Sequence, residues 1–412
     1  MDVSRLRFSR FAQSVKGSSA WYTPNEMSTN TYSLSGYGDM IADQIRIEAF
    51  SEALRRAIRP GTVVADIGTG PGIMAVLACQ LGASRVFAIE ASDVIQVARE
   101  IAAANKCEDK IVFFEDLSTK VSIPVQADVI LSDLRGILPL FQSHIPSISD
   151  ARRRLLAPGG TLIARKDKIW AAVVEAPEAY SKIVDPWQRN PLGQNLASPQ
   201  RRLLNEFRKA RVKPEQLLTK PQIWATLDYF TIENPNVRGT LQWTAERSGT
   251  GHGILVWFDM ELADGVGFST GPAAPETVYG AAFFPWLEPV PLTLKQKLCV
   301  ELEAKLIDND YFWRWTTQTE SPEITGKAAV RFEQSQLHGA VISLAKLHKM
   351  ESDYIPQLSA EGLIRRRALD LMDGKTSLEN IARRLSIEFP GRFIRWQQAL
   401  TFASLISNEN GR

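Results

Sequence analysis

Three glycines and two acidic residues form the first group of side chains whose types and spacing could do chemistry. Gly68, Gly70 and Gly72 follow an apolar run that contains Asp66. Glycines let a backbone pass close to a ligand and turn sharply into a helix whose N-terminus faces that ligand. About 20 residues further on, Glu90 ends a second apolar run, where a carboxylate suits a bidentate hydrogen bond to the two hydroxyls of a ribose. The pattern predicts a site for a ribose-containing cofactor.

The identity of that cofactor depends on the details of the loop. A nicotinamide fingerprint would read GxGxxG, and the stretch Pro71-Gly72-Ile73-Met74 does not supply its last glycine. Asp66 before the glycines and Glu90 after them fit the loop that binds S-adenosylmethionine (SAM) better. The alternative interpretation is that the glycines mark only a tight turn between a strand and a helix.

Short apolar strands and helical stretches alternate around this loop and must position it. The predicted strands are 63–67, 85–89, 110–114, 127–131 and 161–165, and the predicted helices are 39–58, 73–81, 93–105 and 149–156. Strands that are separated by helices predict a parallel, doubly wound α/β sheet of the Rossmann type. We expect the glycine loop to join the first strand of this sheet to the helix that follows it.

The rest of the chain has a different character. Aromatic-rich segments that alternate with turns predict an antiparallel β barrel or sandwich, and they lie at 224–232, 239–246, 253–261 and 298–307. A polar, arginine-bearing stretch at 187–212 is typical of a protruding helical arm. The last residues show helical spacing behind a capping box, Thr376-Ser377-Leu378-Glu379, and predict three helices. The predicted domains are a flexible arm at 1–30, a cofactor domain at 31–170, a β domain at 171–350 and a helical module at 351–412.

Composition limits the function classes further. A formal net charge of +2 over 412 residues lacks the strong basic field of a dedicated nucleic-acid binder. Three distant cysteines and four scattered histidines predict neither a disulfide framework nor a metal site. No apolar run reaches the roughly 18 residues that a membrane span needs, and the first residues lack an apolar signal core. We therefore expect a soluble cytoplasmic protein without membrane or nucleic-acid partners.

Specific motifs then indicate a family. The stretch from Tyr37-Gly38-Asp39-Met40, through the glycine loop and Glu90, to Ser132-Asp133-Leu134-Arg135-Gly136 resembles class I SAM-dependent methyltransferases. Among these it is similar to the protein arginine methyltransferase family. The resemblance runs roughly over residues 32–320 and is weaker in the β region. It implies an enzyme that uses SAM as its cofactor.

The resemblance also implies roles for individual residues. Arg46 would pair with the SAM carboxylate, and Asp66, Gly68 and Gly70 would line the methionine and ribose portions. Glu90 would hold the ribose, while Ser118 and Thr119 would flank the adenine. For Arg46 the alternative is a solvated charge on the face of a helix.

The acceptor site departs from the family pattern. Asp133 and Gln142 stand where the family has two glutamates that grip a guanidinium, and the family's His-Trp pair would fall near Tyr279-Gly280. A neutral amide binds a cation less well than a carboxylate does, and burying an unbalanced cation is costly. These changes argue against an arginine acceptor. Asp133 is then a candidate base or orienting group, or else a turn cap. Gln142 is a candidate contact for a carbonyl or neutral amine, or else a surface residue.

The C-terminal pattern over residues 369–385 is similar to small PqqD-like domains, which hold precursor peptides for modifying enzymes. The alternative is a helical cap on the β domain. The leading hypothesis is a methyltransferase that acts on a nitrogen or oxygen of a peptide or small molecule, in natural-product biosynthesis. A non-catalytic protein that keeps the SAM fold and presents a peptide is the other hypothesis. A homodimer is among the expected partners.

Overall fold

The computed structural model describes residues 32–320 and 329–411, so the predicted N-terminal arm at 1–30 lies outside the described residues. The chain divides into two compact units, Met1–Ala340 and Val341–Arg412. Within the described ranges, no helix is long and apolar enough to cross a membrane.

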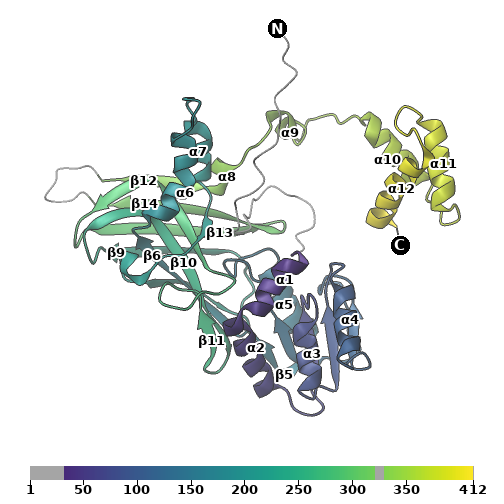
Figure 1. Ribbon diagram of the computed structural model, residues 1–412, viewed down its shortest axis with the longest axis horizontal. Helices are drawn as coiled ribbons and strands as arrows, with labels where there is room; N and C mark the ends of the chain where they lie inside the picture. Colours follow the sequence, from purple (N-terminus) through teal and green to yellow (C-terminus); the bar gives the residue numbers. More distant parts are fainter. Residues whose placement is uncertain (1–31, 321–328, 412) are drawn as a thin grey trace, which may run out of the picture. The chain divides into compact units, whose positions relative to one another are not determined.

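The first unit begins with a parallel five-stranded sheet in the order β3-β2-β1-β4-β5, which confirms the predicted doubly wound fold (Figure 1). Its strands are β1 (Val63–Ile67), β2 (Arg85–Ile89), β3 (Ile111–Phe114), β4 (Ala127–Ser132) and β5 (Leu156–Ile163). Three helices connect them, α3 (Ile73–Gln80), α4 (Ile95–Ala104) and α5 (His144–Arg154). Because the strands are parallel, their carboxyl ends meet at one edge, where open α/β sheets bind ligands.

Two predicted boundaries in this sheet are wrong. Helix α5 was expected at 149–156 but begins five residues earlier, with Pro146 inside its first turn, where a missing N–H costs little. The expected strand at 161–165 is also shifted, because β5 already starts at Leu156 and runs through Pro158-Gly159-Gly160. The pairing of β4 with β5 slips at this point, so the glycines belong to an irregular strand rather than to the end of a helix.

The predicted single helix at 39–58 is two helices, α1 (Leu34–Ala42) and α2 (Gln44–Ala57). Asp43 separates them and caps α2, since its side chain accepts a hydrogen bond from the Arg46 backbone N–H at 3.0 Å. Its other carboxylate oxygen accepts from the backbone N–H of Val278 at 2.7 Å. This break sets the start of α2 and therefore the position of Arg46.

Antiparallel strands make up the second half of the first unit, as predicted. One sheet has the order β7-β12-β10-β6-β8, with β11 paired to β10, and another has the order β15-β14-β13-β9. The strands are β6 (Lys166–Val174), β7 (Arg208–Ala210), β8 (Gln222–Asp228), β9 (Val237–Thr244), β10 (Gly249–Ala263), β11 (Val266–Ser269), β12 (Ala281–Leu292), β13 (Lys297–Ile307), β14 (Asp310–Thr319) and β15 (Arg331–Ser335). The predicted boundary at 170/171 falls inside β6, so the β domain starts earlier.

The expected arm at 187–212 is only partly helical. Helix α6 (Pro177–Gln188) ends where the arm was predicted to start, and α7 (Ala197–Leu203) follows before the chain returns to β7. Both helices stand on the β domain (Figure 1). Short helices complete the connections, η1 (Pro214–Gln216) and α8 (Gln336–Gly339).

The second unit contains α9 (Leu344–His348), α10 (Ala360–Asp370), α11 (Leu378–Glu388) and α12 (Trp396–Asn410). The last three share a core of their own that includes Ile364, Ile381, Leu385 and Ile406. The predicted capping box is displaced by one residue, because Ser377 rather than Thr376 caps α11. The Thr376 backbone N–H is bound instead by Asp373. The predicted three-helix module is otherwise confirmed.

Candidate cofactor and acceptor site

The glycine loop lies between β1 and α3, as predicted. Gly68, Gly70 and Gly72 all have positive φ angles, of 70°, 53° and 79°, which side chains rarely adopt. A Cβ on Gly68 would lie 2.4 Å from Leu134 Cδ2, and a Cβ on Gly70 would lie 2.7 Å from Tyr37 Cε1. The loop therefore runs directly beneath side chains from the β4 edge and from α1.

Glu90 follows β2 and holds this loop in place. Its Oε2 atom accepts from the Gly70 N–H at 3.1 Å, and its Oε1 atom accepts from the backbone N–H and the hydroxyl of Ser92 at 3.0 and 2.8 Å. Burial, and then the nearby charge of Glu90, raises the pKa of the Tyr37 hydroxyl to about 12. Glu90 and Tyr37 thus both lie against the loop at Gly70.

Asp66 is a buried carboxylate without a cationic partner. Its side chain accepts from the Thr69 hydroxyl at 2.5 Å, and the residue is 4% exposed. Burial raises the pKa of Asp66 to about 7, although the Thr69 hydrogen bond lowers it. Among the described residues no lysine, arginine or histidine forms an ion pair with it. Such a carboxylate becomes fully ionised when a ligand brings a positive charge.

Ser118 and Thr119 lie in a turn shortly after β3, at the same edge of the sheet. Ser118 is buried, and its carbonyl accepts from Arg154 Nη2 at 2.8 Å, whereas Thr119 is exposed. The segments after the first four strands thus carry, in turn, the glycine loop, Glu90, Ser118 with Thr119, and Asp133.

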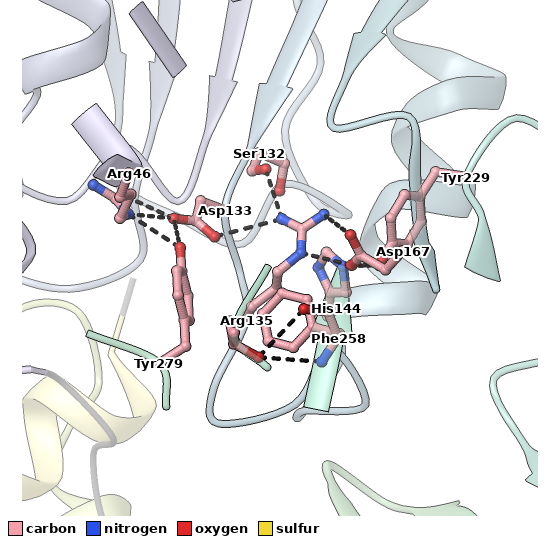
Figure 2. Close-up of polar contacts among 10 residues, drawn as sticks. Arg46, Ser132, Asp133, Arg135, His144, Asp167, Tyr229, Phe258 and Tyr279 are labelled. Carbon is pink, nitrogen blue, oxygen red and sulfur yellow. Dashed lines mark hydrogen bonds and ion pairs between the residues drawn. The ribbon is translucent and has the colours of Figure 1, made fainter. Parts of the chain in front are cut away.

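Asp133 is the meeting point of two side chains from distant segments (Figure 2). Its Oδ2 atom accepts from Arg46 Nε at 2.8 Å and from the Tyr279 hydroxyl at 2.6 Å, and Arg46 Nη2 lies 2.6 Å away. Burial alone would raise the pKa of Asp133. The guanidinium groups of Arg46 and Arg135 outweigh burial, so this pKa lies below its ordinary value. Asp133 is a firmly ionised acceptor of hydrogen bonds.

A second buried ion pair lies beside Asp133, on the side away from Arg46 (Figure 2). Arg135 Nε donates to Asp167 Oδ2 at 2.7 Å, and Nη2 donates to Oδ1 at 3.4 Å. Arg135 Nη1 donates to the second oxygen of Asp133, Oδ1, at 3.4 Å. The side chains of Arg135 and Asp167 are 1% and 0% exposed, so water cannot solvate either charge.

Two further buried side chains fix this pair. The Tyr229 hydroxyl donates to Asp167 Oδ2 at 2.5 Å, and the His144 ring nitrogen Nε2 lies 3.0 Å from the same hydroxyl. The guanidinium of Arg135 also lies over the Tyr229 ring, 5.3 Å from its centroid. Burial, and then the charge of Arg135, lowers the pKa of His144 well below its ordinary value, so the ring is neutral.

Sequence reasoning missed this network, although two of its members were within reach. Arg135 lies in the family-like motif around Asp133, but the resemblance implies no binding or catalytic role for it. Tyr279 was noted only as the place where a family residue is absent. Asp167 offered no such signal, because it lies between Lys166 and Lys168 at the start of β6 and resembles part of an exposed charged segment.

Gln142 lies in the turn before α5 with φ at 42°, in the left-handed region. Among the described residues it has no hydrogen bond to Asp133. The two predicted acceptor residues are thus not joined by a hydrogen bond.

Breaking the buried pair should destabilise the fold strongly. Asp167→Asn leaves the buried Arg135 guanidinium with the 3.4 Å contact to Asp133 as its remaining ion pair among the described residues, so the free energy of unfolding in urea should fall by about 3–5 kcal/mol. Changing both partners together, Arg135→Gln with Asp167→Asn, should cost clearly less, because no charge is left unpaired. Equal losses for the single and double variants would contradict this account.

Comparisons with known proteins agree with the two halves of the first unit. A family model described as ribosomal protein L11 methyltransferase matches residues 48–176, and one described as the arginine methyltransferase oligomerization subdomain matches residues 165–315. The chain is 31% identical over 258 residues to protein arginine N-methyltransferase 6 of Xenopus tropicalis, over 59% of this chain and 76% of that protein.

The probable protein arginine N-methyltransferase 6 of Arabidopsis thaliana is also 31% identical, over 234 residues and 55% of this chain. The chain spans about half of that relative's length, 54%. Among solved structures, the Trypanosoma brucei PRMT1 enzyme–prozyme complex with AdoHcy matches with a TM-score of 0.66 at 19% identity, over 73% of this chain and 97% of that one. Arabidopsis thaliana protein arginine methyltransferase 10 matches at 0.64 and 21%, over 74% and 97%. These structures share the fold.

Proposed function

We propose, from the premise that this chain belongs to the protein arginine N-methyltransferase family, that it binds SAM and transfers the methyl group to a nitrogen or oxygen of a peptide or small molecule. SAM is the cofactor of this family. One observation carries the proposal: the glycine loop, Asp66, Glu90 and Arg46 converge at the carboxyl edge of the parallel sheet.

The residues present fit that cofactor. Asp66 is buried without a cation, and the ammonium of a methionine moiety is the charge it lacks. Arg46 has five N–H groups, and the bonds to Asp133, Tyr279 and Met40 engage three of them, which leaves two for a ligand carboxylate. Glu90 Oε2 accepts only the Gly70 N–H and can accept a further hydrogen bond from a ribose hydroxyl. Ser118 and Thr119 would flank the adenine.

In the proposed reaction the protein acts mainly by position. Bound SAM supplies a methyl group on a sulfonium, ready for in-line displacement. Asp133 would orient the acceptor rather than take its proton, because a general base works best with a pKa near the operating pH and that of Asp133 lies low. Gln142 would contact the acceptor from the turn before α5. Holding the two reacting atoms in line provides most of the rate enhancement.

The acceptor would not be an arginine in the manner of the family. Asp133 and Gln142 stand at the two glutamate positions, and a neutral amide cannot balance the charge of a guanidinium. A non-catalytic protein that presents a peptide is the second candidate, and the engagement of both Asp133 oxygens favours it. Binding of SAM without turnover on any acceptor would support that candidate. A homodimer and a cytoplasmic location stay predictions, and the oligomerization-subdomain match supports the first.

Loss of the Glu90 carboxylate should weaken SAM binding. Glu90→Ala removes the acceptor for the ribose hydroxyls and for the Gly70 N–H, so the Kd from calorimetry should rise at least tenfold, about 1.4 kcal/mol. Glu100→Ala, on the exposed face of α4, is the matched control and should leave the Kd unchanged. A folded Glu90→Ala protein with wild-type affinity would remove the central claim.

The affinity for SAM should depend on pH through Asp66. In the free protein its pKa is about 7, and only the ionised form pairs with the ligand ammonium. Affinity should therefore level off above that pH for as long as the ligand amine stays protonated, and fall by about tenfold per pH unit below it, since binding must then release a proton. Asp66→Asn should bind more weakly at about pH 8 and lose the slope. An identical slope in wild type and Asp66→Asn would assign it to another group.

The second unit would hold a peptide acceptor, as PqqD-like domains do. It has its own core, and the described cofactor residues all lie in the first unit. Ending the chain at Ala340 should leave SAM affinity intact and raise the apparent KM for a peptide acceptor more than it lowers kcat, as loss of uniform binding does. Unaltered kinetics in the folded shorter chain would refute peptide recruitment, and aggregation or early melting would favour a structural cap.

A further inference from the structure

We propose that the Arg135–Asp167 ion pair is a specificity determinant: it places a permanent guanidinium beside Asp133 and so makes the acceptor site favour an uncharged group over a cation. This inference rests on the proposed function, because it concerns the acceptor of the same site. It names the class of that acceptor as a neutral nitrogen or oxygen group.

Asp133 has an internal hydrogen-bond donor at each of its two oxygens. Oδ2 accepts from Arg46 and from the Tyr279 hydroxyl, at 2.8 and 2.6 Å. Oδ1 faces Arg135 Nη1 at 3.4 Å. A guanidinium acceptor needs a carboxylate that offers both oxygens to its N–H groups. Here an internal guanidinium already lies against the inner oxygen.

The charges of the buried cluster around Asp133 balance one another. Arg46 and Arg135 are cations that form ion pairs with the Asp133 and Asp167 carboxylates. Burial raises the pKa of Asp167, and the charge of Arg135 opposes that rise and favours the ionised form. Burial raises the pKa of the Tyr229 and Tyr279 hydroxyls and lowers that of His144, so all three groups are neutral. The cluster therefore carries no net charge. A cationic acceptor would add an unbalanced charge beside two guanidinium groups, whereas an uncharged acceptor would not.

The contacts of Arg135 hold its side chain in one rotamer, so it does not move aside for a cationic acceptor. Asp167 binds it through two oxygens, at 2.7 and 3.4 Å, and Tyr229 holds Asp167 in turn. The Ser132 carbonyl accepts from Nη1 at 3.3 Å, and the Tyr229 ring covers one face of the guanidinium. Four of the five N–H groups of Arg135 are thus engaged, and an alternative rotamer would leave Asp167 buried without its counterion.

A pair of matched probes separates charge from shape. A Gly-Arg-Gly-type peptide and its citrulline counterpart have side chains of nearly the same shape, but only arginine is charged. We would titrate both into the full-length chain loaded with S-adenosylhomocysteine and compare the two affinities by calorimetry. The wild type should bind the citrulline peptide at least as tightly as the arginine peptide. Arginine binding tenfold or more tighter in the wild type would overturn the proposal.

The double variant Arg135→Gln with Asp167→Asn should shift this preference toward arginine by at least tenfold, because it exposes Asp133 Oδ1 without leaving a buried charge unpaired. Arg135→Lys is the matched control, since it keeps the positive charge, and it should retain the wild-type preference. A folded double variant without the shift, or a Lys variant with the same shift, would refute the role of the charge. If neither peptide binds the wild type, the double variant must still bind arginine more tightly than citrulline.

Loading with S-adenosylhomocysteine provides the independent readout. A wild-type chain that does not bind this compound would defeat the proposed function itself, whereas loading with the wrong peptide preference defeats only this inference. Should the double variant fail to fold, Arg135→Met with Asp167→Leu removes the same two charges with apolar groups, which buried pairs often tolerate. The expected shift toward arginine is the same.

Discussion

The carboxylate of Asp133 is the point at which the separate parts of the first unit are tied together. It stands just after β4, and it binds Arg46 from α2 and Tyr279 from the segment before β12. Asp43 adds a second link between α2 and that segment through the Val278 N–H. Charge-assisted hydrogen bonds of this kind are strong and directional. The relative placement of cofactor loop, first helices and β domain follows from them.

The same carboxylate limits the chemistry of the site. Two guanidinium groups and a tyrosine hydroxyl keep it ionised, so it organises its surroundings rather than exchanging protons. Asp66 lies on the neighbouring strand β1 and differs from Asp133, because burial without a cationic partner keeps its pKa near neutrality. Two carboxylates at one sheet edge thus differ in role because one has counterions and the other does not.

Much of this could be predicted from the sequence, and the limits are physical. The parallel sheet and the glycine loop were recognisable because alternation of apolar strands with helices, and glycines at a strand end, are local patterns. The break at Asp43 was missed because an aspartate in an amphipathic run is compatible with a continuous helix until the Val278 N–H engages it. The start of β5 was misplaced because Pro158-Gly159-Gly160 normally ends an element, whereas here a register slip absorbs it.

The site was harder to predict than the fold, because its decisive contacts join residues that are far apart in the chain. Arg135 and Asp167 are ordinary charged residues until the fold buries both, and no local pattern announces that they meet. Tyr279 likewise gains its role only when β12 is brought to the end of β4. The positions where the sequence departs from its family could be identified from the sequence. The contacts that Arg135 and Tyr279 make with Asp133 could not.

The buried pair has an evolutionary consequence. Exchanging Arg135 first leaves Asp167 without its cation, and exchanging Asp167 first leaves Arg135 with only its longer contact to Asp133. Each single-step path away from the pair therefore crosses an intermediate of reduced stability. Tyr229 and His144 form hydrogen bonds around the pair, so its replacement would disturb them as well. The pair is therefore hard to lose, because only a coordinated double replacement avoids that intermediate.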